Sequence, residues 1–136
     1  MTLRYPERRE KSKKFFPHFV QDFDSDKHPP YFSFRYLTDS HCITKCNRDE
    51  QASFAKKMLR LSKLTWGDIK QQDRHKLGFE KIARTALRTA LPSNITEDVS
   101  LIAFRFHEFK PMIGYRVNAT FYVVWFDPKM RLYDHG

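Results

Sequence analysis

Side chains able to move protons and to contact phosphate gather in the last third of the chain. Arg105 and His107 are two positions apart in a segment that alternates apolar and polar residues, so both would lie on one face of a strand. Arg116 stands in the next segment of this type, and Tyr133 and His135 are again two positions apart near the carboxyl end. The spacing indicates a candidate catalytic set of His107, Arg116, Tyr133 and His135, with Arg105 beside it.

This set of side chains suits cleavage of RNA without a metal ion. A base removes the proton of the 2′ hydroxyl, cations stabilise the charge that develops on the phosphate, and an acid protonates the leaving 5′ oxygen. His107 or His135 would be the acid or the base, and Arg105 and Arg116 would contact the phosphate. The alternative is that these side chains are polar only because they face water on the outer side of a sheet.

Other chemistries lack their signatures in this chain. It contains no GxxxxGK[ST], GxGxxG, HExxH or GxSxG motif, and its four glycines can hardly build a glycine-rich phosphate loop. The six histidines are scattered, and Cys42 and Cys46 have no second Cys or His pair at zinc spacing. We therefore expect reduced thiols, no metal site and no cofactor.

The net charge of +9 is concentrated in two regions. Residues 1–20 carry six Lys or Arg against two Glu, and residues 53–90 carry ten against three acidic residues. Such a local excess attracts nucleic acid, an acidic membrane surface or an acidic protein partner. Of these partners we expect RNA. Because the chain has neither an apolar run of membrane-spanning length nor the apolar core of a signal peptide, we expect a cytoplasmic protein that binds no membrane.

Helical periodicity in the second basic region predicts how its cations are displayed. Phe54, Met58 and Leu61 follow the spacing of one helix face, with a basic stripe two positions out of phase. Thr65 is a candidate cap for a short helix, and FEKIARTALRTALP (79–92) predicts a third helix. The candidate RNA-binding residues lie on these helices, in the loop before the third helix and on the following strand: His75, Lys76, Lys81, Arg84, Arg88, Arg105, Lys56 and Arg60.

Period-two alternation predicts a sheet. The predicted strands cover residues 31–37, 100–109, 113–126 with a tight turn at 117–120, and 130–133. We predict an α+β fold in which a twisted antiparallel sheet has helices packed on one face and its other face toward solvent or substrate.

The first thirty residues differ from the rest in composition. They are highly charged, hold four of the seven prolines and end in Pro29 and Pro30. We therefore predict an N-terminal basic aromatic arm over residues 1–30 and a single domain over residues 31–136.

Three segments of the chain resemble the toxins of the RelE and ParE superfamily and a set of bacterial proteins near them. These segments are YFSFRYL with LTWGDI, DRHKLGFEKI, and GYRVNATFYVVWFDPKMRLYDHG, within residues 31–136. The resemblance implies helices on a twisted antiparallel sheet, cleavage of mRNA, often on the ribosome, and neutralisation by an antitoxin protein. It also implies that Arg116 binds phosphate, that LYDHG is the catalytic edge and that His75 lines the site. Where many relatives have a histidine two residues after Asp-Pro, this chain has Met130.

The sequence thus predicts a toxin-like, metal-independent endoribonuclease. Two alternatives use the same basic helices: a nucleic-acid-binding or regulatory module without catalysis, and an interaction protein with an acidic partner. One feature separates them. Convergence of the histidines and Arg116 within about 8 Å in a groove would favour the enzyme, and their separation would favour the binding module.

Overall fold

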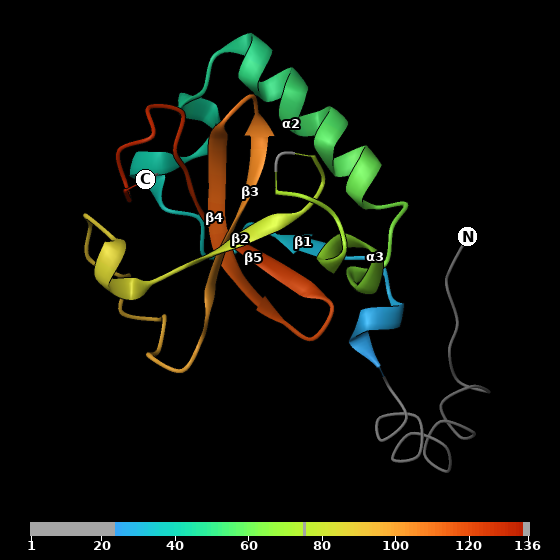
Figure 1. The fold of residues 1–136 in the computed structure, drawn as a ribbon. Coiled ribbons are helices and arrows are strands. Elements are labelled where there is room, and N and C mark those ends of the chain that lie inside the picture. Colours follow the sequence, from blue (N-terminus) through green and yellow to red (C-terminus); the bar gives the residue numbers. More distant parts are fainter. Residues whose placement is uncertain (1–23, 75, 135–136) are drawn as a thin grey trace, which may run out of the picture.

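The computed structural model describes residues 24–74 and 76–134. Within them it contains two α-helices, five strands and several short 3-10 turns. Figure 1 shows the arrangement. In chain order the helices and strands are β1 (Tyr31–Ser33), α2 (Arg48–Leu61), α3 (Trp66–Lys70), β2 (Phe79–Ile82), β3 (Leu101–His107), β4 (Lys110–Val117) and β5 (Thr120–Phe126).

The five strands form one mixed sheet in the order β1-β5-β4-β3-β2. The central three strands make an antiparallel meander, as the alternation predicted, and β2 also pairs antiparallel with β3. Strand β1 instead runs parallel to β5. The predicted wholly antiparallel sheet is wrong at this edge, because alternation reports which face a residue occupies and not the direction of a partner strand far along the chain.

Two tight turns join the strands of the meander. Glu108 between β3 and β4, and Asn118 between β4 and β5, both have φ of 53°. Asn tolerates this left-handed conformation well, which confirms the turn predicted over residues 117–120. At Gly114 the ladder between β4 and β5 shifts register, and an added Cβ would stand 1.9 Å from the Tyr122 carbonyl oxygen.

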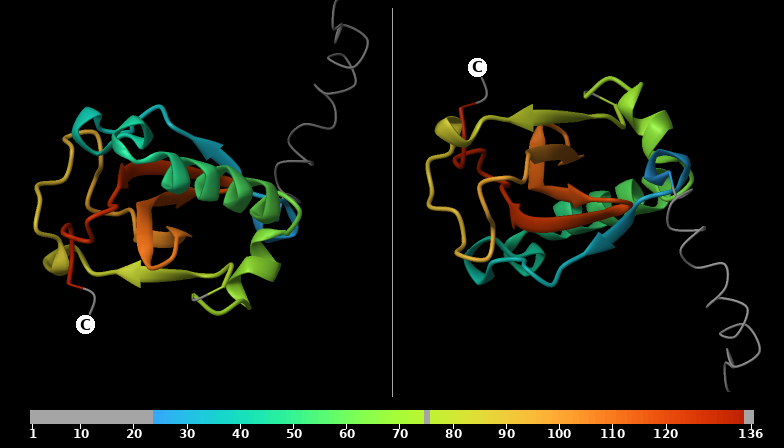
Figure 2. Two further views of the ribbon diagram at one scale, coloured as in Figure 1. Left: turned by 90° about the horizontal axis from the view of Figure 1, so that it is seen from above. Right: turned by 90° about the horizontal axis from the view of Figure 1, so that it is seen from below.

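Helices α2 and α3 cover one face of the sheet (Figures 1 and 2). Their Leu61, Trp66 and Ile69 pack with Phe104 and Phe121 in a first core cluster. Phe54 and Met58 of α2 pack against the same cluster, so the predicted inward face of this helix is confirmed. Helix α3 begins at a capping box formed by Thr65 and Asp68. In the described part of the chain, no helix has the length and apolar character to cross a bilayer.

The second face of the sheet is also covered, although the alternation suggested that it would face solvent or substrate. Leu101, Ile113 and Val124 pack there with Ile95 from the loop before β3 and with Tyr133 near the carboxyl end. Irregular segments supply this cover, so no helical or strand period marked it in the sequence.

The predicted helix over residues 79–92 is wrong. Residues 79–82 form β2, which pairs with β3 through Phe79 opposite Phe104, and a single 3-10 turn follows at Arg84–Ala86. The proposed apolar stripe relied on alanines, of which Ala83 and Ala90 are exposed. Pairing of Phe79 and Ile82 with β3 outweighs the local helical preference of the alanine-rich segment.

Two other predicted strands are shorter or absent. The strand over residues 31–37 ends at Ser33, after which Leu37 N–H donates to the Phe34 carbonyl in a turn. Residues 130–133 make only an isolated bridge, between Tyr133 and Leu87. Residues 1–23 of the predicted arm lie outside the described residues. Its last part packs on α3, where Trp66 N–H donates to the His28 carbonyl at 2.9 Å.

Candidate functional site

Helix α2 is anchored so that its basic side chains border the end of β3. Asn47 and Glu50 form a capping box at its start. Glu50 then pairs with Lys110 of β4 at 2.7 Å, and Ser53 contacts His107 of β3 at 2.6 Å. These two contacts hold the helix against the β3–β4 turn.

A pocket of about 320 Å³ lies between α2, the β3–β4 turn and the loop before β2. We call it the basic pocket, because Lys and Arg side chains line it against a single carboxylate. It contains the predicted residues Lys56, Arg60, Lys76, Arg105 and His107, together with Ser53, Lys57, Phe106 and Glu108. Tertiary folding thus joins cations that are up to 49 positions apart in the chain.

Lys57 is the functional candidate that the sequence interpretation missed. It is only 6% exposed, and its Nζ donates to the Lys76 carbonyl at 2.6 Å. Burial, followed by repulsion from Arg60 and Arg105, lowers the pKa of Lys57 to about 8. A signal was available: Lys57 falls on the same helix face as Phe54 and Leu61, where a cation must be buried.

His107 sits in a short chain of polar contacts inside the basic pocket. Its Nδ1 is 2.6 Å from the Ser53 hydroxyl oxygen, and its Nε2 is 3.5 Å from Glu108 Oε1. Ser53 therefore orients the imidazole through Nδ1, as a group that accepts or donates a proton at its other nitrogen requires. Beside it, the Arg105 guanidinium lies 4.9 Å from the centre of the Phe109 ring.

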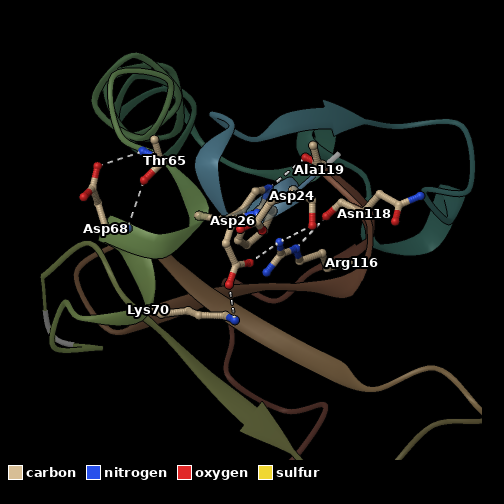
Figure 3. Close-up of polar contacts among 10 residues, drawn as sticks. Asp24, Asp26, Thr65, Asp68, Lys70, Arg116, Asn118 and Ala119 are labelled. Carbon is tan, nitrogen blue, oxygen red and sulfur yellow. Dashed lines mark hydrogen bonds and ion pairs between the residues drawn. The ribbon is translucent and has the colours of Figure 1, made fainter. Parts of the chain in front are cut away.

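Arg116, predicted to be catalytic, lies in a different contact network (Figure 3). Its guanidinium donates to Asp26 Oδ1 at 2.6 Å, to the Ser25 hydroxyl at 2.9 Å and to the Asn118 carbonyl at 2.6 Å. The same group lies 4.3 Å from the centre of the Trp66 ring. Arg116 does not line the basic pocket.

Asp26 is shared between two cations in this network. Lys70 of α3 donates to its second carboxylate oxygen at 2.8 Å, and Figure 3 shows Lys70 and Arg116 both directed at Asp26. The hydrogen bonds from Lys70 and then Arg116 lower the pKa of Asp26. The network links the short turn at Ser25–Lys27 to α3 and β4, which is a structural role for Arg116.

Tyr133 also does not line the basic pocket, and it belongs to the second core cluster, on the face opposite α2. It is 4% exposed, and its hydroxyl donates to Glu80 at 2.8 Å. Burial, together with that hydrogen bond, raises the pKa of Tyr133. Nearby, buried Asp127 accepts backbone N–H bonds from Arg131 and Leu132, so the polar carboxyl end builds a folded turn.

The remaining predicted RNA-binding residues do not reach the basic pocket. Lys81 and Arg84 line a separate pocket, and Arg84 donates to the Thr96 and Val99 carbonyls. Arg88 is exposed beyond the 3-10 turn. They lie apart because their segment forms β2 and a loop instead of a helix. His75 and His135 lie outside the described residues.

Comparison of the chain with protein-family models, with curated proteins and with solved structures finds no match. The resemblance to RelE and ParE toxins therefore stays an expectation from three sequence segments. The side chains of the basic pocket are the feature of the structure that supports a function.

Proposed function

We propose that the protein binds RNA through the basic pocket. The observation that carries this proposal is the meeting of five Lys or Arg side chains around one pocket that has a single carboxylate, Glu108, in its lining. The phosphates of a nucleic acid are the repeated anions that such a cluster attracts.

The buried position of Lys57 supports the same interpretation. Holding an ammonium group near Arg60 and Arg105 destabilises the unbound protein, because like charges repel and burial removes water. A bound phosphate would relieve that repulsion. A basic surface kept only for solubility would leave its cations exposed and separated.

Salt dependence of binding tests the proposal. Affinity for a labelled RNA oligonucleotide should fall as salt rises, and Lys56→Ala or Arg60→Ala should reduce the slope of log affinity against log salt by about 0.7 to 0.9 per lost phosphate contact. Fluorescence anisotropy over a salt series measures both quantities. Arg35→Ala is the matched control, because Arg35 is exposed beyond β1, at the opposite edge of the sheet from β2.

Two results would contradict RNA binding at this pocket. One is an affinity that does not change with salt. The other is an equal loss of affinity in Arg35→Ala and Arg60→Ala. Absence of RNA binding would favour an acidic protein partner, the class to which a neutralising antitoxin would belong.

Metal-independent cleavage of the bound RNA is a second candidate, favoured by the contact of His107 with Ser53 and Glu108 in the pocket. In this mechanism His107 takes the 2′ hydroxyl proton and the 2′ oxygen attacks phosphorus. The P–O5′ bond breaks, leaving a cyclic phosphate and a 5′ oxygen that Lys57 protonates. Arg105 would stabilise the developing charge. Arg116 and Tyr133, with contacts elsewhere, have no part in it.

His107→Ala tests cleavage separately from binding. If His107 is the base, the variant should cut labelled RNA in EDTA at least about 100-fold more slowly, with or without ribosomes, and should still bind it. Ser53→Ala should shift the pH profile of cutting, because Ser53 positions the imidazole. Binding without any cutting by the wild-type protein would leave an RNA-binding module.

A further inference from the structure

We infer that the RNA at the basic pocket is single-stranded and that one of its bases stacks on the Phe109 ring. This inference rests on the proposed function and adds the class of RNA that is bound and the residue that selects it.

Phe109 is a large aromatic side chain that the fold leaves exposed to solvent. It lies in the turn between β3 and β4, next to Glu108 with its left-handed backbone, and it is 61% exposed. The two core clusters do not include it. A ring that stays in water gains no burial from folding, whereas a base can cover it.

The ring is coupled to the basic pocket through Arg105. This arginine lines the pocket, and its guanidinium lies 4.9 Å from the centre of the Phe109 ring. A nucleotide could therefore place its phosphate among the pocket cations and its base near the ring. Aromatic rings beside cationic grooves hold successive bases of single strands in this way.

Stacking on a protein ring distinguishes single strands from duplexes. In a duplex each base is covered by its neighbours and only the ends offer a free face, whereas an unpaired base can turn outward and stack on an aromatic side chain. Phosphate contacts alone carry no such selectivity, because both forms present phosphates. Phe109 would supply the preference.

Three ligands, two substitutions of Phe109 and one control substitution test the inference. The ligands are a single-stranded RNA, the same RNA as a duplex, and inorganic polyphosphate, which has the charge without the bases. Phe109→Leu keeps an apolar side chain and removes the ring, while Phe109→Tyr keeps the ring. Leu59→Ala is the control, because Leu59 is 59% exposed on α2 and has no π-face.

We expect Phe109→Leu to weaken binding of the single strand by about 5- to 150-fold. Its affinity for polyphosphate should stay unchanged, Phe109→Tyr and Leu59→Ala should bind like wild type, and the duplex should bind more weakly than the single strand. Thermal unfolding of each variant verifies that the fold is kept.

Several outcomes would overturn the inference while leaving RNA binding intact. An unchanged single-strand affinity in Phe109→Leu would exclude stacking. An equal loss for polyphosphate would mean that Phe109 acts only by positioning Arg105, and equal affinity for duplex would refute the strand preference. Failure of the wild-type protein to bind any of the three ligands would overturn the proposed function itself.

Discussion

Two arginines on neighbouring strands, Arg105 and Arg116, have different surroundings in the folded protein. Arg105 and His107 are two positions apart in the sequence, and both line the basic pocket. Arg116 has a similar strand setting, yet its guanidinium is held by Asp26 and lies over Trp66. The sequence identifies which side chains can carry charge or move protons, but their neighbours decide whether a ligand can use them.

Lys57 should make RNA binding depend on pH. With a pKa near 8 in the free protein, it loses its charge as the pH rises, whereas a bound phosphate would keep it protonated. RNA affinity should therefore fall roughly fourfold between pH 7 and 8.5 in wild type. The groups that face Lys57 are Arg60, Arg105 and the Lys76 carbonyl. Anisotropy titrations at several pH values measure the effect.

The matched variants are Lys57→Met and Lys56→Met, which remove one buried and one exposed ammonium. Only Lys57→Met should flatten the pH dependence. The sign for folding follows from linkage: a lysine whose folded pKa is depressed makes the protein more stable as the pH rises from about 8 toward the unfolded value of 10.5. A Lys57→Met protein with an unaltered pH profile would contradict this role.

Among the elements, three predictions made from local signals are confirmed. The helix with Phe54 and Leu61 on one face, the Thr65 cap and the turn at Asn118 were all predicted from short windows and all formed. The helix over residues 79–92 failed because its stripe was mostly alanine, which gains little from burial. Its first four residues instead complete the edge of the sheet beside β3.

The network that joins Arg116, Asp26 and Lys70 should stabilise the packing of three elements and leave RNA binding alone. Arg116→Met should lower the free energy of unfolding by about 1 to 3 kcal/mol, because Asp26 loses a charged partner and Trp66 its stacked cation. Urea unfolding measures this loss. RNA affinity should stay at the wild-type value, unlike that of Arg60→Ala.

The pH dependence of the free energy of unfolding tests the same network. Asp26 has a lowered pKa, so its stabilising contribution is complete above the unfolded value of 3.8 and is lost as the pH falls through the lower folded value. Asp26→Asn should remove that acid-dependent part, and Asp39→Asn at an exposed turn should not. A stable Arg116→Met protein that no longer binds RNA would restore Arg116 as a phosphate ligand.

In the whole molecule, the sheet edge, the second core cluster and the basic pocket are all formed by segments that are far apart in the chain. Strand β1 lies beside β5 in parallel, and irregular segments near Ile95 and Tyr133 close the second face of the sheet. The basic pocket likewise joins α2, the β3–β4 turn and the loop carrying Lys76. Periodicity describes only residues that are near each other in the chain, so it could not predict these contacts between distant segments.

The α+β class, helices α2 and α3, the central meander and the excess of cations in residues 53–90 could all be predicted from the sequence. Those features depend on side-chain spacing, capping and charge, which act within one segment. The folded structure was needed to show that Lys56, Arg60 and Arg105 line one pocket and that Arg116 and Tyr133 do not line it. That partition depends on strand order, sheet face and burial, which arise when segments far apart in the chain pack together.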